Sequence, residues 1–366
     1  MSATRYLALP EPFAFTGGGH LSGARLAYET WGTLRSARDN AVLILTGMSP
    51  GAHAASSPDD QTEGWWEAII GPGKAIDTDR FFVICANNLG SCRGSTGAAS
   101  DDPRSGTPYR MDFPRLSLED IARAKLHLLD HLGVARAHAV IGPSMGGMTA
   151  LALLALAPGR VARAGLLSTA MQATPMAIAL RSLQRDIVLG DPGFAGGAYA
   201  HALDVRSGMG LARKLGVITY RSADEWLTRF GRARIDGTDP QALTHEFQIE
   251  AYLQGHADRW AGSFDPACYL YLSHAMDGFE LASHGRPVEV LRRAALESAL
   301  VIGVATDLLF PLWQQDELAR TLTEAGVPTR FAALPSVQGH DSFLVDIERF
   351  APPIRELLEH PSIGSC

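Results

Sequence analysis

The sequence predicts an α/β fold in which a mostly parallel sheet is interrupted by a large helical insertion. Short apolar runs at 41–45 and 299–304 are typical of strands that are buried on both faces of a parallel sheet. Helical patterns alternate with such strands, as parallel connections require. Between 172 and 294 this alternation stops, and Arg-rich helical segments dominate. We therefore predict a core domain of residues 1–171 and 295–366 and a helical cap domain of residues 172–294.

A short motif, Gly142-Pro143-Ser144-Met145-Gly146, lies between an apolar strand and an Ala-rich apolar helix. In that context G-x-S-x-G is typical of the nucleophile elbow of the α/β-hydrolase fold. The two glycines would let strand and helix approach each other closely around a strained serine. The motif predicts Ser144 as a nucleophile and the amide of Met145, at a helix start, as an oxyanion donor. The alternative is an ordinary glycine-rich turn with a passive serine.

A serine at an elbow needs a base to take its proton. In this fold the partners follow in the order Ser, Asp or Glu, then His, each in a loop after a strand. Asp307 and His340 follow the last two predicted strands, so we predict that Asp307 orients the imidazole and His340 moves the proton. Asp341 and Asp346 are competing acids for the role of Asp307.

The second oxyanion donor is expected in the loop that follows strand 41–45. The amides of Leu45 and Thr46 are both placed to supply it. We predict that Leu45 acts with Met145.

Composition excludes several classes of protein. The chain has 366 residues, 46% of them hydrophobic, and a net charge of −7, which suits a globular enzyme and disfavours nucleic acid as a partner. The chain has no apolar run of transmembrane length and begins without a signal core, so we expect no membrane partner and a cytoplasmic location. His127 and His131 have zinc-like spacing, but no glutamate follows the first histidine. We predict no metal site and no resident cofactor.

Long segments resemble the homoserine O-acetyltransferase family, and the resemblance covers nearly the whole chain. These segments are 64–67, 70–80, 89–97, 142–148 and 339–344. Within that family the chain most resembles the serine O-succinyltransferase branch. The stretches that carry this closer resemblance are 46–54, 181–185 and 212–222.

The resemblance implies a two-step acyl transfer in which succinyl-CoA, a co-substrate, acylates Ser144 and L-serine then accepts the succinyl group. The product would be O-succinyl-L-serine, for cysteine biosynthesis. The resemblance places Arg213 at the carboxylate of the amino acid and Asp341 at its amino group. We predict Arg185 at the succinyl carboxylate. The resemblance also implies a homodimer. A transferase must keep water from its acyl-enzyme, and we expect the helical cap to do this.

Three alternatives stay open. The first is a homoserine O-acetyltransferase or O-succinyltransferase of methionine biosynthesis, which would use L-homoserine and acetyl-CoA or succinyl-CoA. One methylene separates serine from homoserine and is worth only about 1–3 kcal/mol in a pocket. The second is an esterase or thioesterase, which would need no amino acid. The third is a non-catalytic binding protein with this fold.

Overall fold

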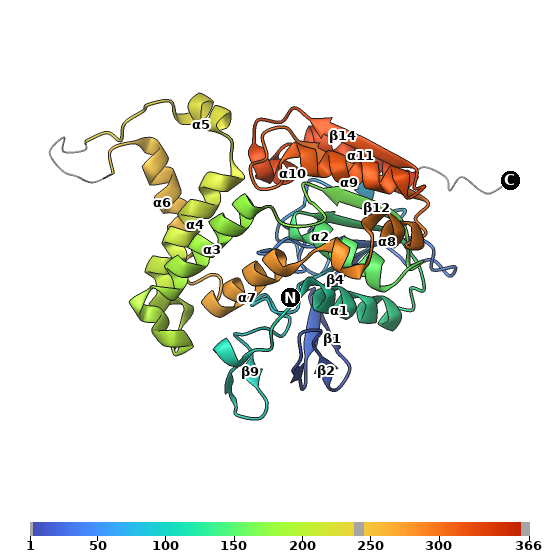
Figure 1. The fold of residues 1–366 in the computed structure, drawn as a ribbon, viewed down its shortest axis with the longest axis horizontal. Coiled ribbons are helices and arrows are strands. Elements are labelled where there is room, and N and C mark those ends of the chain that lie inside the picture. Colours follow the sequence, from blue (N-terminus) through green and yellow to red (C-terminus); the bar gives the residue numbers. More distant parts are fainter. Residues whose placement is uncertain (1–2, 238–244, 360–366) are drawn as a thin grey trace.

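The computed structural model describes residues 3–237 and 245–359. Its centre is an eight-stranded sheet with the order β1-β4-β8-β5-β11-β12-β13-β14, which Figure 1 shows from one side. In chain order, these strands are β1 (Arg5–Ala8), β4 (Arg25–Trp31), β5 (Ala41–Leu45), β8 (Phe82–Ala86), β11 (Ala137–Pro143), β12 (Val161–Leu167), β13 (Ser298–Val304) and β14 (Thr329–Leu334).

The direction of the strands brings distant loops together. β4 pairs antiparallel with β1 and β8, whereas all neighbours from β8 to β14 are parallel. The predicted α/β fold with a mostly parallel sheet is therefore confirmed. Because parallel strands end at the same edge, the loops after β5, β11, β13 and β14 meet there, which is where ligands bind in such sheets.

Helices cover both faces of the sheet. α1 (Leu118–His131), α2 (Met145–Leu156), α8 (Pro287–Arg293) and α9 (Leu312–Glu324) form one layer, and α11 (Ile347–Glu359) packs on the other face. The strands are apolar on both sides: Leu43 and Val140 belong to the apolar cluster around α2, while Ile44 and Ile141 belong to the cluster around α11. Full burial of such a side chain contributes about 1.5–3 kcal/mol.

A second group of helices stands beside the sheet (Figure 1). It comprises α3 (Pro175–Leu189), α4 (Arg206–Tyr220), α5 (Ala223–Phe230), α6 (Gln248–Trp260) and α7 (Pro266–Gly278). α4 packs on α3 and α6, and α7 packs on α3. The end of the predicted cap, which includes η4 (Leu281–His284) and α8, packs instead on α2 and α9. The exact division into two domains stays a prediction.

The remaining elements are short. Three isolated pairs are β2 (Phe13–Ala14) with β3 (His20–Leu21), β6 (Ile70–Gly71) with β7 (Ile76–Asp77), and β9 (Asp101–Asp102) with β10 (Thr107–Pro108). The other short helices are η1 (Arg110–Asp112), η2 (Pro192–Gly197), η3 (Ala202–Val205), η5 (Gly339–Asp341) and α10 (Ser342–Val345). No helix in the described part of the chain is long and apolar enough to cross a bilayer.

Candidate active site

Ser144 occupies a sharp turn between β11 and α2. Its backbone angles are φ 55° and ψ −125°, a conformation that costs a residue with a side chain about 1–3 kcal/mol. Neighbouring groups hold it there: its amide donates to the carbonyl of Leu167 at 2.9 Å, and the Thr169 hydroxyl donates to its carbonyl at 2.8 Å. A Cβ added at Gly142 would overlap the backbone of Gly146, so the turn requires glycine at that position.

The structure brings Ser144, His340 and Asp307 together. Nε2 of His340 lies 2.8 Å from the Ser144 hydroxyl oxygen, and Nδ1 lies 2.8 Å from one carboxylate oxygen of Asp307. The other oxygen of Asp307 accepts the amides of Leu309 and Phe310, both at 2.9 Å. With Nδ1 donating to the carboxylate, Nε2 is free to accept the serine proton.

The two competing acids lie elsewhere. Asp346 is paired with Arg349 at 2.9 Å. Asp341 is paired with Arg221, its carboxylate oxygen 3.4 Å from the guanidinium Nε. The geometry therefore favours Asp307 as the partner of the imidazole.

His340 is buried, and aromatic rings surround it. Its ring stacks on Phe310, with centroids 5.2 Å apart, and meets the edge of Phe343 at 5.7 Å. Burial lowers the pKa of His340, but the charge and hydrogen bond of Asp307, together with the charge of Asp341, outweigh it, so the pKa lies above its ordinary value. This environment favours the imidazolium that forms when the serine loses its proton.

A pocket of about 180 Å³ opens above the serine hydroxyl. The loop after β5 forms one wall and the cap helices α3, α4 and α7 form another, so the site lies between the core and the cap. The lining residues are Gly47, Met48, Ser49, Pro50, Trp65, Ser144, Arg181, Gln184, Arg213, Thr219, Tyr220, Tyr269, Met276, Leu309, Phe310, His340, Asp341, Phe343 and Leu344.

Two predicted binding residues line this pocket with opposite charges. The Arg213 guanidinium lies over the rings of Trp260 and Tyr220, 4.8 and 5.6 Å from their centroids. Among the described residues, no carboxylate lies within salt-bridge distance of Arg213. Burial raises the pKa of Asp341, against the opposing charges of Arg221, His340 and Arg213. The pair could receive the carboxylate and the ammonium of a zwitterion.

The third predicted binding residue, Arg185, does not line this pocket. Its Nη1 donates to Asp277 at 2.6 Å and to Ser273 at 2.9 Å, and the side chain faces a separate surface hollow. Arg181, one helical turn earlier, lines the pocket instead. Its Nε donates to Asp277 at 2.5 Å, while its buried Nη2 has no hydrogen-bond partner among the described residues. A buried, unpaired guanidinium nitrogen is costly unless a ligand satisfies it.

The two predicted oxyanion donors lie on either side of the elbow. Met145 begins α2, and its amide donates to no backbone carbonyl of the described chain outside that helix. A Cβ added at Gly146 would overlap the carbonyl of Leu45, so the end of β5 passes directly beside the turn. The following loop is held by Asn88, whose side chain donates to the carbonyl of Gly47 at 2.9 Å. The roles of Leu45 and Met145 stay proposals.

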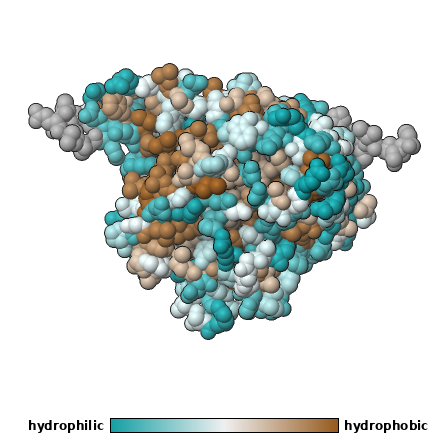
Figure 2. Space-filling model, viewed as in Figure 1, coloured by the Kyte–Doolittle hydropathy of each residue, from teal (hydrophilic) through white to brown (hydrophobic). Residues whose placement is uncertain are grey.

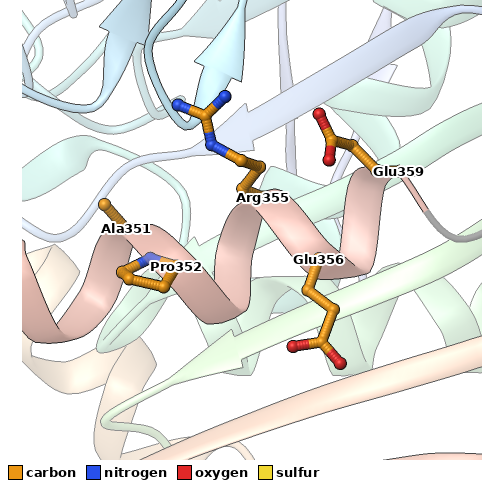
Figure 3. A pocket seen from close by; sticks show the side chains of 5 residues that line it. All are labelled: Ala351, Pro352, Arg355, Glu356 and Glu359. Atoms are coloured by element: carbon orange, nitrogen blue, oxygen red, sulfur yellow. The ribbon is translucent and has the colours of Figure 1, made fainter.

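A wider hollow of about 540 Å³ lies along α11 (Figure 3). It is lined by Ala351, Pro352, Arg355, Glu356 and Glu359. Each of its charged side chains has a partner: Arg355 donates to the carbonyl of Gly73 at 2.8 Å, Glu356 pairs with Arg330, and Glu359 pairs with Arg80. It shares no lining residue with the pocket above Ser144.

Comparison with known proteins identifies the family and the fold of the chain. The family described as alpha/beta hydrolase fold matches residues 40–344. A serine O-succinyltransferase of Stenotrophomonas maltophilia is 54% identical over 361 residues, 97% of each chain. An L-serine/homoserine O-acetyltransferase of Streptomyces lavendulae is 54% identical over 364 residues, again 97% of each chain. The crystal structure of homoserine O-acetyltransferase from Bacillus anthracis superimposes with a TM-score of 0.89 at 28% identity, covering 99% of both chains.

The chain belongs to the homoserine O-acetyltransferase family of α/β-hydrolase-fold acyltransferases. The sequence analysis did not predict three side chains that contact or line the site: Thr169, Arg181 and Arg221. Arg181 had a usable signal, because it lies one turn from Arg185 and therefore on the same helix face. Nothing local marked Thr169, whose contact with the Ser144 carbonyl exists only in the folded chain.

Proposed function

We propose that this protein is a serine O-succinyltransferase, which moves the succinyl group of succinyl-CoA to the hydroxyl of L-serine. One observation carries the proposal: Ser144, hydrogen-bonded to His340, lines a pocket that is also lined by two arginines and a carboxylate. Arg213 and Asp341 match the two charges of an amino acid, and Arg181 matches a second carboxylate. An esterase of neutral esters has no need for this charge pattern.

In the first half-reaction, His340 takes the proton of the Ser144 hydroxyl, and the serine oxygen attacks the thioester carbonyl. The resulting oxyanion is stabilised by the amide of Met145 and a second amide from the Leu45–Thr46 segment. The carbon–sulfur bond breaks, and the thiolate of CoA takes the proton from the imidazolium. CoA leaves, and the succinyl group remains as an ester on Ser144.

In the second half-reaction, the hydroxyl of L-serine loses its proton to His340 and attacks the ester carbonyl. The oxygen of Ser144 leaves and recovers the proton from the imidazolium, so enzyme and product are both restored. Arg213 would hold the carboxylate of the acceptor and Asp341 its ammonium group. This fixes the acceptor hydroxyl near the ester, which favours transfer to serine over transfer to water.

Arg181 is our proposed residue for the succinyl carboxylate, in place of Arg185. Arg181 lines the pocket that contains Ser144, and its buried Nη2 has no hydrogen-bond partner among the described residues. An acetyl group has no carboxylate and would leave this nitrogen unsatisfied. A succinyl group would provide a charge-assisted hydrogen bond, which is typically worth about 1.5–3 kcal/mol.

The test is an assay of acetyl-CoA and succinyl-CoA against L-serine and L-homoserine, with release of CoA and acylated product measured separately. The proposal expects the highest kcat/KM for succinyl-CoA with L-serine, and little CoA release beyond one equivalent without an amino acid. Preference for acetyl-CoA and L-homoserine would instead assign the protein to homoserine O-acetylation. Steady CoA release without an acceptor would identify a thioesterase.

We also propose that two copies associate through the cap. Apolar side chains gather over the cap helices in Figure 2. The exposed ones in the cap are Met176, Ile178, Leu183, Leu189, Leu203, Leu211, Ile218 and Leu227. An extended exposed apolar surface of this kind is typical of a protein interface. Sedimentation velocity should give a dimer that Leu183→Asp dissociates, whereas Leu156→Asp, on the core, should leave it intact; a monomeric native protein would contradict the proposal.

A further inference from the structure

The corner between α4 and α5 packs directly on the loop that carries His340. α4 ends at Tyr220, and Ser222 caps the start of α5. A Cβ added at Gly339 would lie 2.7 Å from the carbonyl oxygen of Tyr220 and 3.0 Å from Cα of Arg221. The Ser222 hydroxyl donates to the carbonyl of Val337. The cap therefore contacts the catalytic loop through backbone atoms at this corner.

The side chain of Arg221 places a positive charge from this corner beside Asp341. Its Nε lies 3.4 Å from a carboxylate oxygen of Asp341, and its Nη1 donates to Glu225 at 3.2 Å. The Arg221 side chain is only 13% exposed. Asp341 lines the pocket and Arg221 does not, so Arg221 reaches the site through its ion pair with Asp341.

Several charged groups face the carboxylate of Asp341. Arg221 comes from the corner, Arg213 from α4, and His340 and Asp307 from the core. Burial raises the pKa of Asp341, and the positive charge of Arg221 is the largest opposing influence. Loss of Arg221 would therefore raise this pKa further and favour the neutral acid, which cannot pair with an ammonium group.

We propose that Arg221 is a positioning residue for the acceptor half of the reaction, holding the Asp341 carboxylate ionised and aimed at the ammonium group of the amino acid. Glu225 holds the far side of the Arg221 guanidinium and so fixes its direction. This inference rests on the proposed function. It assigns to the cap a part in recognising the acceptor that is separate from the direct contact of Arg213.

The test compares Arg221→Gln and Arg221→Lys with a matched control, Arg229→Gln. Arg229 lies 3.9 Å from the same Glu225, is half exposed, and is not paired with Asp341. Rapid-quench measurement of the CoA burst reports acylation, and kcat/KM for L-serine reports the acceptor step. 3-Hydroxypropanoate, which is L-serine without its amino group, serves as an acceptor that cannot pair with the Asp341 carboxylate.

Arg221→Gln should lower kcat/KM for L-serine by about tenfold, because Asp341 loses its ion pair and part of it becomes the neutral acid, with an unchanged CoA burst. The preference for L-serine over the amine-free acceptor should shrink, and the acid limb of the L-serine profile should move to higher pH. Arg221→Lys, which keeps the positive charge, should return the acid limb most of the way to its native pH. Arg229→Gln should behave like the native enzyme.

Equal losses in the burst and in the acceptor step, or an unmoved acid limb, would overturn the role of Arg221 and indicate a structural contact only. If both Arg221 variants failed to fold, Glu225→Gln would give the same test, because it loosens Arg221 without removing it. These outcomes are distinct from failure of the proposed function, in which the native enzyme itself would not transfer succinyl groups to L-serine.

Discussion

The three catalytic groups from the core and the two pocket arginines from the cap differ in how their polar atoms are satisfied. In the core, Asp307, His340 and Ser144 form a continuous hydrogen-bonded chain, and Asp307 is further satisfied by two backbone amides. In the cap, Arg181 has a buried nitrogen without a partner, and Arg213 lies over aromatic rings without a carboxylate among the described residues. The reacting groups are therefore organised without a ligand, whereas in the proposed function the two arginines are completed by substrate.

The largest effect is expected at the centre of the core. Ser144→Ala should lower transfer by about 10⁵-fold or more, because no acyl-enzyme can form. Circular dichroism should show an intact fold, since the hydroxyl faces the pocket. Substantial turnover by this variant would place the chemistry elsewhere and would remove the distinction between the two regions.

Asp307→Asn should lower the rate of acylation by about 10³- to 10⁴-fold, because the imidazole loses its orienting anion. The sign of the pH effect is fixed by the structure. The charge of Asp307 raises the pKa of His340, so its loss should lower that pKa and move the acid limb of the remaining activity to lower pH. An acid limb that moved to higher pH would contradict this account of the imidazole.

A smaller and more selective effect is expected in the cap. Arg213→Ala should lower kcat/KM for the amino acid by about 100-fold, because the acceptor carboxylate loses its cation. The CoA burst should stay near its native amplitude and rate. Lys214→Ala, the neighbouring cation that does not line the pocket, is the matched control. A native acceptor KM in Arg213→Ala would exclude the contact.

Arg181→Met should reduce the preference for succinyl-CoA over acetyl-CoA by about tenfold or more, since the donor carboxylate loses a charge-assisted bond. Arg185→Met provides the control, because both arginines pair with Asp277 but only Arg181 lines the pocket. Equal changes in the two variants would show that the pair acts on the packing of α3 and α7 rather than on the donor. Competition between the two thioesters gives the ratio directly.

The contrast between regions also explains what could be predicted from sequence. Strand runs, strand ends and the elbow motif are local signals, so the sheet and the positions of Ser144, Asp307 and His340 followed from the chain alone. Arg181 and Arg185 lie on one face of α3, and the packing of α3 against its neighbours decides which of them reaches the pocket. Arg221 meets Asp341 across a long separation in sequence, which no periodic pattern encodes.

The strained backbone of Ser144 has a practical consequence. Glycine adopts a positive φ freely, so Ser144→Gly would release about 1–3 kcal/mol of strain and lose about 0.5–1 kcal/mol to the greater freedom of the unfolded chain. Calorimetry should give Ser144→Gly a free energy of unfolding about 1 kcal/mol higher than that of Ser144→Ala, which keeps the strain. Such an inert variant could be crystallised with the intact thioester, a complex that the active enzyme would convert to acyl-enzyme and free CoA.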